Sequence, residues 1–333
     1  MVDVQLGNCG LRVSPLCLGT MNFGSSTPLP KARDIADKAL DSGVFFWDTA
    51  DMYGDGASEQ IVGQLLQRRR QEVVLATKVY APMGPGPNDR GLSARHILRA
   101  CEASLQRLGT DWIDLYYLHL PDRSVRIEET LRAMEDLVRS GKVRYIGCSN
   151  YWTWEIMGLL RVADREKWQP LSAVQPLYNI VNRDIEVELL PMATSEGLGV
   201  VTYSPLARGI LTGKYRFDET PPPDTRLARS NPRFLKAEWR RESVEVAHAL
   251  GHLAADRSCK PAELAVAWTL ANPRVHSVII GPRTSEHLDT YLRGATIDID
   301  ADLESAIDAL VPPGTHTGRT FPDDHYFPIR GRC

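Results

Sequence analysis

The sequence lacks the features that would place it in a membrane or on a nucleic acid. No stretch of its 333 residues approaches the roughly 18 consecutive apolar residues of a membrane-spanning helix. The N-terminus, MVDVQLGNCG, lacks the charged and then apolar layout of a secretory signal peptide. Its 39 basic and 42 acidic side chains give a formal net charge of -3, and the RRR run at 68–70 is interpreted as a solvated helix end. We therefore expect no nucleic-acid partner and no membrane partner.

Cysteine is sparse and scattered, which argues against both a disulfide framework and a metal site. The six cysteines are Cys9, Cys17, Cys101, Cys148, Cys259 and Cys333. None has a close neighbour in sequence at metal-ligand spacing, so a reduced, cytoplasmic location is expected. His248 and His252 lie four residues apart, but no H-E-x-x-H pattern accompanies them, and we predict no metal site.

Short apolar segments alternate with amphipathic ones along most of the chain. The apolar segments are PLCLGTM (15–21), VFFWDTA (44–50), EVVLATKV (72–79), IDLYYLHL (113–120), VRYIGCSN (143–150), SAVQPLYN (172–179), GVVTYSPL (199–206) and HSVIIGP (276–282). Most are continuous apolar runs, which is typical of strands buried on both faces, as in a parallel sheet covered by helices. Between them we predict helices that include 58–69, 93–109, 126–141 and 184–197. The expected N-caps are Ser58 and Ser93, and the expected C-caps are Gly109, Gly141 and Gly197.

Eight such units predict an α/β protein with a (β/α)8 TIM barrel, formed by residues 1–333 as a single domain. The main rival is an open, doubly wound sheet. Such a sheet usually carries a G-x-G-x-x-G fingerprint after its first strand. Here the first strand continues as LGTMNFG, so the barrel is favoured.

Three segments fall outside the repeat. Residues 4–14 are expected to form an N-terminal β-hairpin that closes the bottom of the barrel. Residues 207–236 form a long, polar, proline-rich loop after the seventh strand, and loops of this length are usually functional. The tail from Val311 has no helical or strand periodicity, and the sequence leaves open whether it crosses the barrel mouth.

Polar residues stand where the predicted strands end. The C-terminal ends of barrel strands face the active site, and here they deliver Asp48, Tyr53, Lys78, His119, Ser149, Asn150 and Gln175. Taken singly, Asp48 is typical of a capping residue and His119 of a satisfied core histidine. Lys78 is harder to explain, because a buried lysine needs a partner, and Asp48 on the next strand is the obvious one. Together, four titratable groups at one end of one barrel indicate a functional site.

This group has a chemical logic. A lysine cation beside the phenol of Tyr53 favours release of its proton, and Asp48 would keep Lys78 charged and oriented. Tyr53 could then protonate a carbonyl oxygen that His119 aims by a hydrogen bond. The set contains no nucleophile and no metal, so something else must supply the electrons.

The segments FWDTADMYGDGASEQIVGQLL, LATKV, LYYLHLPD, VRYIGCSN and VVTYSPLARGILTGKY resemble the aldo-keto reductase family, including its branch of potassium-channel β-subunits. The resemblance implies a barrel that binds NADP(H) extended across its mouth and transfers hydride to an aldehyde or ketone. The family's catalytic tetrad would be Asp48, Tyr53, Lys78 and His119. Sugar-derived carbonyls are among the substrates that the family suggests.

The resemblance also implies cofactor contacts. The matched positions are Thr20, Met21, Asp48, Ser149, Asn150, Gln175, Tyr203, Ser204, Pro205, Leu206, Arg208, Lys214, Gly281, Arg283 and His287. Ser149, Asn150 and Gln175 would hold the carboxamide. Tyr203 would stack on the nicotinamide, and residues 204–208 with Lys214 would cover the pyrophosphate, with Arg226 a further candidate.

The sequence departs from the family pattern after the eighth strand. Many members carry Lys-Ser, then Arg, then Glu-Asn there, whereas this chain has Gly281-Pro282, His287 and Thr290-Tyr291. Arg283 could bind the 2′-phosphate bidentately. NADP(H) is therefore expected as the cofactor, with NAD(H) left open.

Three functional hypotheses remain. The first is an NADP-dependent carbonyl reductase that uses Tyr53 as general acid, and the second is a cofactor-sensing regulatory protein of the channel β-subunit type with little turnover. The third is a Schiff-base aldolase using Lys78, which the neighbouring carboxylate disfavours because it would raise the lysine pKa. A small carbonyl substrate would meet a pocket shaped by Met21, Phe23, Trp47, His316, Phe321, His325 and Tyr326. The sequence predicts neither the physiological substrate nor the oligomeric state.

Overall fold

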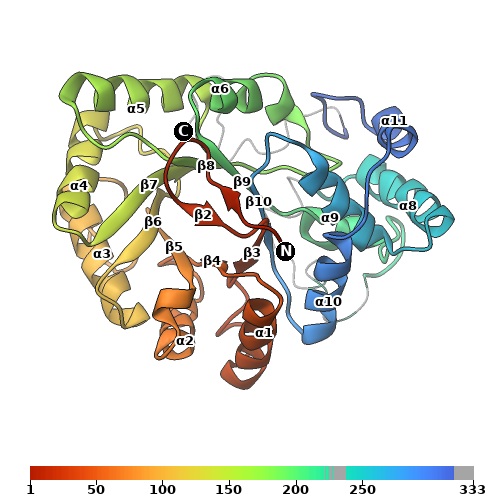
Figure 1. The fold of residues 1–333 in the computed structure, drawn as a ribbon, viewed down its shortest axis with the longest axis horizontal. Coiled ribbons are helices and arrows are strands. Elements are labelled where there is room, and N and C mark those ends of the chain that lie inside the picture. Colours follow the sequence, from red (N-terminus) through yellow and green to blue (C-terminus); the bar gives the residue numbers. More distant parts are fainter. Residues whose placement is uncertain (222, 224, 226–227, 229–237, 319–333) are drawn as a thin grey trace.

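Eight parallel strands close into a barrel in a computed structural model that describes residues 1–221, 223, 225, 228 and 238–318 (Figure 1). The strand order is β10-β3-β4-β5-β6-β7-β8-β9. The strands are β3 (Leu16–Gly19), β4 (Phe46–Asp48), β5 (Val74–Val79), β6 (Ile113–Leu118), β7 (Val143–Ser149), β8 (Ala173–Gln175), β9 (Gly199–Tyr203) and β10 (Ser277–Ile280). Each lies within one of the eight apolar segments, so the predicted (β/α)8 TIM barrel is confirmed.

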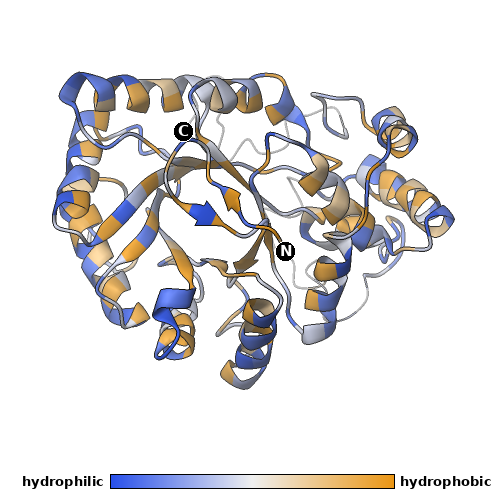
Figure 2. Cartoon of the chain, in the orientation of Figure 1, coloured by the Kyte–Doolittle hydropathy of each residue, from blue (hydrophilic) through white to orange (hydrophobic). Residues whose placement is uncertain are grey.

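Helices surround the barrel and turn their apolar faces toward it (Figure 2). They are α1 (Leu29–Asp41), α2 (Ala57–Leu66), α3 (Ala94–Leu108), α4 (Ile127–Arg139), α5 (Thr153–Glu166), α6 (Leu189–Ser195), α8 (Arg241–Asp256), α9 (Pro261–Ala271), α10 (Ser285–Gly294) and α11 (Ala301–Leu310). Short 3₁₀ helices follow α2, β8 and β9: they are η1 (Arg70–Glu72), η2 (Asp184–Glu186) and η3 (Ala207–Thr212). No helix within the described residues is long and apolar enough to cross a membrane.

The core has two layers, because alternate residues of each strand face opposite sides. Inside the barrel, Cys17, Phe46, Leu115 and Tyr117 belong to one apolar cluster. Their strand neighbours point outward and join the larger cluster between the strands and the helices, as Tyr116 does. This double burial explains why the strands read as continuous apolar runs.

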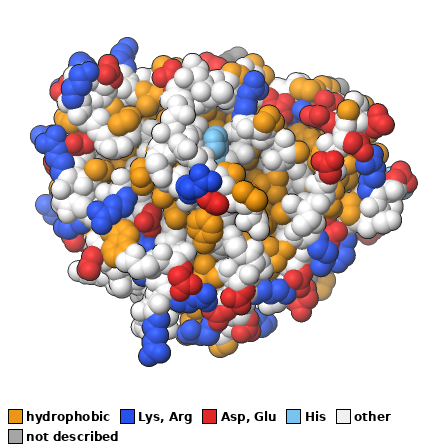
Figure 3. Space-filling view, in the orientation of Figure 1, with side chains coloured by type: hydrophobic (Ala, Val, Ile, Leu, Met, Phe, Trp, Pro, Cys, Tyr) orange, Lys and Arg blue, Asp and Glu red, His pale blue; other side chains and the backbone are white. Residues whose placement is uncertain are grey.

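The N-terminal hairpin closes one end of the barrel, as predicted. Its strands β1 (Val4–Gln5) and β2 (Arg12–Val13) pair antiparallel. Leu6 is fully buried in the inner cluster, and the amide of Asn8 donates to Gly197 O at 2.8 Å, just before β9 begins. Figure 3 looks onto this end, where positive and negative side chains are interspersed rather than gathered by sign.

Two local predictions were wrong. The expected helix over 184–197 is divided into η2 and the short α6, and Pro191 lies in the first turn of α6, where a missing N–H costs no helical bond. Ser58 does not cap α2, because Gly56 occupies the N-cap position with φ 93°. The Ser58 hydroxyl instead donates to Thr20 O at 2.8 Å, inside the protein.

The other predicted caps agree with the structure. Ser93 accepts a hydrogen bond from the amide of His96 at the start of α3, and Gly109 ends that helix in the left-handed conformation. Gly141 and Gly197 come directly after the C-caps of α4 and α6, with φ of 73° and 68°.

The long loop and the tail are only partly within the described residues. After β9 the chain forms η3, and residues 311–318 follow α11 without joining a named helix or strand. His316 makes an isolated bridge to Asn182. Arg226, Phe321, His325 and Tyr326 lie outside the described residues, so the predictions for them stay predictions.

Candidate active site

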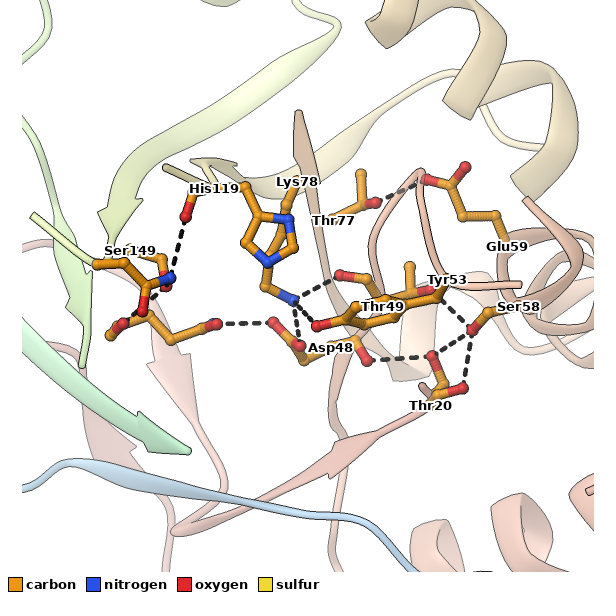
Figure 4. Close-up of polar contacts among 12 residues, drawn as sticks. Thr20, Asp48, Thr49, Tyr53, Ser58, Glu59, Thr77, Lys78, His119 and Ser149 are labelled. Atoms are coloured by element: carbon orange, nitrogen blue, oxygen red, sulfur yellow. Dashed lines mark hydrogen bonds and ion pairs between the residues drawn. The ribbon is translucent and has the colours of Figure 1, made fainter. Parts of the chain in front are cut away.

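Adjacent strand ends bring the predicted tetrad together at the end of the barrel opposite the hairpin (Figure 4). Asp48 is the last residue of β4 and is paired in register with Ala76 of β5. Lys78 lies two residues further along β5, so its side chain points to the same side of the sheet as Ala76. His119 directly follows β6, and Tyr53 lies in the turn after β4.

Lys78 is fully buried, and each of its three hydrogens has an acceptor. It forms an ion pair with Asp48 Oδ1 and donates to Thr49 O at 2.7 Å and to Tyr53 Oη at 3.3 Å. Burial lowers the pKa of Lys78, but the charge of Asp48 and the phenol of Tyr53 outweigh it and leave that pKa above its ordinary value. A lysine held charged in this way cannot serve as a Schiff-base nucleophile at neutral pH.

The hydrogen bond between Lys78 and Tyr53 has a direction that bears on the role of Tyr53. Because the ammonium donates to the phenolic oxygen, the hydroxyl hydrogen of Tyr53 is not used in that contact. The imidazole of His119 stands edge-on to the Tyr53 ring, with centroids 6.0 Å apart and an interplanar angle of 81°. Tyr53 and His119 therefore present two polar groups toward the same region of the barrel mouth.

A hydroxyl network fixes the turn that carries Tyr53. The amide of Thr20 donates to Asp48 O at 2.9 Å, and Ser58 Oγ lies 2.9 Å from Thr20 Oγ1 and 3.0 Å from Thr49 Oγ1. The amide of Ser58 donates to Tyr53 O at 3.1 Å. Thr20, which the sequence suggested as a cofactor contact, is fully buried in this network.

On the other side of the mouth, the four residues predicted to hold the nicotinamide form a chain of hydrogen bonds. Tyr203 Oη donates to Asn150 Oδ1 at 2.6 Å, and Asn150 Nδ2 donates to Ser149 Oγ at 2.9 Å. Ser149 Oγ in turn donates to Gln175 O at 2.7 Å. This set of amides and hydroxyls suits a carboxamide, which both donates and accepts hydrogen bonds.

The segment after β9, predicted to cover a pyrophosphate, has an unusual backbone. Ser204, Ala207 and Arg208 have φ of 60°, 44° and 53°, although none is glycine. The amide of Ala207 donates to Ser204 O at 2.9 Å and the amide of Gly209 donates to Leu206 O at 2.8 Å, so the segment turns back on itself. The guanidinium of Arg208 lies 2.7 Å from the carboxylate of Glu238, and both side chains are buried.

A second cationic group lies at the edge of the mouth. The amide of Arg283 approaches His287 Nδ1 at 3.4 Å. Partial burial and the positive charges of Arg283 and Lys214 lower the pKa of His287. The three side chains are therefore close enough to interact, although two different segments carry them. Asn22 Nδ2 donates to Gly281 O at 3.3 Å and ties this loop to the one after β3, where Met21 is 42% exposed.

Sequence reasoning missed two features of the site. Gln175 Nε2 donates to Asp48 Oδ2 at 2.9 Å, and Asp51 is buried with no hydrogen-bond partner for its carboxylate oxygens among the described residues. Its position three residues after Asp48 was the only signal in the sequence. No cluster of histidine, cysteine and acidic side chains suited to a metal occurs in the described part of the chain.

Comparison with known proteins identifies the family. The model of the aldo/keto reductase family matches residues 15–312. The chain belongs to the aldo/keto reductase family. The family resemblance drawn from the motifs is thereby confirmed.

Three relatives illustrate its range. An uncharacterized oxidoreductase of Bacillus subtilis, YrpG, is 41% identical, over 96% of this chain and 99% of that protein. A probable voltage-gated potassium channel subunit beta of Arabidopsis thaliana is 37% identical, over 88% and 90%. The L-glyceraldehyde 3-phosphate reductase of Escherichia coli is 35% identical, over 85% and 84%. Family membership and these relatives support an oxidoreductase that reduces carbonyl compounds, and the family generally uses NAD(P)H.

Proposed function

We propose that this protein is an NADP(H)-dependent reductase of aldehydes or ketones in which Tyr53 is the general acid. The observation that carries the proposal is the fully buried Lys78, held by Asp48 and donating to the oxygen of Tyr53. A lysine placed in this way stabilises the phenolate that remains after proton transfer, because its ammonium donates to the phenolic oxygen.

The residues present fit a nicotinamide dinucleotide. The Ser149, Asn150 and Gln175 group suits the carboxamide, and the segment after β9 is the one that the family resemblance assigns to the pyrophosphate. When bound, the cofactor would supply hydride to the substrate carbonyl carbon. Tyr53 would give its proton to the carbonyl oxygen to complete the alcohol.

His119 and Lys78 have separate roles in this scheme. The imidazole of His119, next to the Tyr53 ring, would hydrogen-bond the carbonyl oxygen and orient it. Lys78 would stabilise the Tyr53 phenolate until a proton returns from solvent. Asp48 keeps Lys78 charged in a position that water does not reach.

The cationic group at the mouth supports NADP(H) over NAD(H). The positive charges of Lys214 and Arg283 both act on His287, and the carboxylate of Glu286 acts in the opposite direction. A guanidinium binds phosphate well, so Arg283 is the group that we assign to a 2′-phosphate.

The relatives named as potassium channel subunits support a second hypothesis, a cofactor-sensing regulatory protein. A regulatory protein with little turnover would also need a built cofactor site. Turnover with carbonyl compounds therefore separates the two hypotheses, since a bound cofactor does not.

The decisive test is to mix the purified protein with NADPH or NADH and a panel of aldehydes and ketones, and to follow the loss of cofactor absorbance. We expect turnover that is faster with NADPH, and a decrease in kcat of about a hundredfold or more in Tyr53→Phe. Tyr116→Phe is the matched control, because the buried Tyr116 hydroxyl has no partner among the described residues. It should retain wild-type kcat.

Two results would contradict the proposal. Absence of turnover with every carbonyl, despite NADPH binding, would favour the regulatory function. Equal kcat in wild type and Tyr53→Phe would remove Tyr53 from the role of acid.

A further inference from the structure

The carboxylate of Asp48 is held from two opposite sides of the barrel. Its Oδ1 faces Lys78 on the neighbouring strand, and its Oδ2 accepts a hydrogen bond of 2.9 Å from Gln175 Nε2. Asp48 ends β4 and Gln175 ends β8, and these strands are four places apart in the closed ring of eight. The contact therefore spans the interior of the barrel.

This contact completes the hydrogen bonding of a buried carboxylate. Asp48 is 2% exposed and Gln175 is 3% exposed. Among the described residues, Gln175 is the side chain that donates to Oδ2, since Thr20 bonds the backbone carbonyl of Asp48 instead. A carboxylate only accepts hydrogen bonds, so the amide must present its NH₂ to Asp48 and keep its Oε1 free for another donor.

The same glutamine belongs to the chain of amides and hydroxyls across the mouth. Its backbone carbonyl accepts from Ser149 Oγ, which accepts from Asn150. A continuous series of hydrogen bonds thus runs from Tyr203 to Asp48, and continues through Lys78 to Tyr53.

We propose that Gln175 is a positioning residue that holds the Asp48 carboxylate from across the barrel and thereby orients Lys78 against Tyr53. This inference rests on the proposed function, because it assigns Tyr53 the role of acid. It goes beyond a contact with the cofactor, since one side chain would serve both the nicotinamide side of the mouth and the proton-donating side.

The test replaces Gln175 by methionine, which has similar length but no donor. Without the bond to Oδ2, Asp48 protonates at higher pH and holds Lys78 less firmly. Loss of one hydrogen bond to a charged carboxylate should raise the pKa of Asp48 by about one unit. The acidic limb of the plot of kcat against pH should therefore shift to higher pH by about one unit. At any pH below the midpoint of that limb, this shift corresponds to a loss of roughly tenfold in kcat.

A second measurement does not depend on turnover. The tyrosinate absorbance of the cofactor-free protein, minus that of the same protein carrying Tyr53→Phe, reports the ionisation of Tyr53. Its midpoint should move to higher pH in Gln175→Met, because Lys78 then stabilises the phenolate less well.

Thr77→Val is the matched control. Thr77 Oγ1 donates to the buried carboxylate of Glu59 at 2.6 Å, one residue from Lys78 but on the other side of β5. Loss of this hydrogen bond should lower the free energy of unfolding without shifting the pH dependence of kcat or the midpoint of Tyr53 ionisation. The control therefore distinguishes a loss of stability from an effect on Tyr53.

The outcomes separate the two proposals. If Gln175→Met changes only the KM or Kd of the cofactor, with both pH profiles as in wild type, the positioning role is overturned. If wild type reduces no carbonyl, the proposed function fails, and the Tyr53 midpoint still decides whether Gln175 acts on the Lys78–Tyr53 pair.

Discussion

Carboxylates buried beside the candidate tetrad differ in how well they are satisfied. Glu59 is fully buried, but it accepts from Thr77 Oγ1 and from Arg107 Nε, at 2.6 and 2.7 Å. Asp51 is equally buried, and its carboxylate oxygens have no partner among the described residues. Burial and then the negative charge of Glu59 raise the pKa of Asp51 to about 7. Asp51 is therefore a site at which the folded protein resists ionisation.

Asp51 should make stability fall as the pH rises. An aspartate titrates near 3.8 when unfolded and near 7 here, so its contribution is intact below about pH 4 and is lost as the pH rises through 7. Asp51→Asn cannot ionise and should escape this loss, becoming more stable than wild type at pH 8 by up to about 4 kcal/mol. Urea unfolding of both proteins from pH 4 to pH 8 measures the difference.

The sign of the pH dependence is the critical result. The gap between the two proteins should widen from pH 4 to pH 7 and then stay constant. A gap that is constant throughout would show that Asp51 ionises in the folded protein as it does in the unfolded chain.

At the level of single residues, the clustering of the four candidate catalytic residues could be predicted, and the contacts that support it could not. Asp48, Lys78 and His119 lie at or beside the ends of three apolar strands, and the chain order of the strands makes them neighbours. The contact of Gln175 with Asp48 depends on which strands face each other across the closed barrel. The raised pKa of Asp51 depends on its burial and on the charge of Glu59, and the local sequence encodes neither.

Helix packing around the barrel depends on a glycine at the contact between α2 and α3. A methyl group at Gly63 would lie 2.5 Å from Arg107 O and 2.8 Å from Leu108 O, both at the end of α3. These are backbone atoms, so the helix cannot yield by rotating a side chain. The close approach also brings Arg107 within reach of Glu59, with 2.7 Å between Nε and Oε2.

Gly63→Ala and Gly158→Ala should therefore change stability in opposite directions. The first forces α2 and α3 apart and should cost about 1–3 kcal/mol. The second lies in α5, where the nearest atom to an added methyl is Ile127 Cδ1 at 3.7 Å, so it should stabilise by about 0.5–1 kcal/mol through helix propensity. Urea unfolding of the two variants measures both, and equal effects would contradict the packing argument.

At the level of elements, strands were easier to predict than helix starts. The eight apolar runs could not be confused with exposed segments, because the strands are buried on both faces. Ser58 has the chemistry of an N-cap, but tertiary hydrogen bonds to Thr20 and Thr49 use its hydroxyl instead. The prediction of one helix over 184–197 was wrong, because the segment forms the short η2 and then α6, with Pro191 in the first turn of α6.

In the whole molecule, the residues that stabilise the barrel core and the candidate catalytic residues lie at opposite ends of the barrel. The hairpin closes the end at which the strands begin, and Leu6 fills the inner core there with no exposed surface. The candidate tetrad lies where β4, β5 and β6 end. In barrels of this class the strands' C-terminal end carries the active site and the opposite end contributes to stability.

Leu6→Ala should therefore destabilise the protein without altering catalysis. Removing this buried side chain leaves a cavity under the inner core and should cost about 2–5 kcal/mol of unfolding free energy. Val2→Ala, at a side chain that is 82% exposed, is the control and should be neutral. Urea unfolding measures the change in stability. The effect on catalysis is measured as kcat with NADPH, well below the unfolding temperature of Leu6→Ala. A lower kcat in the folded Leu6→Ala protein would mean that the hairpin end and the tetrad end are coupled through the barrel core.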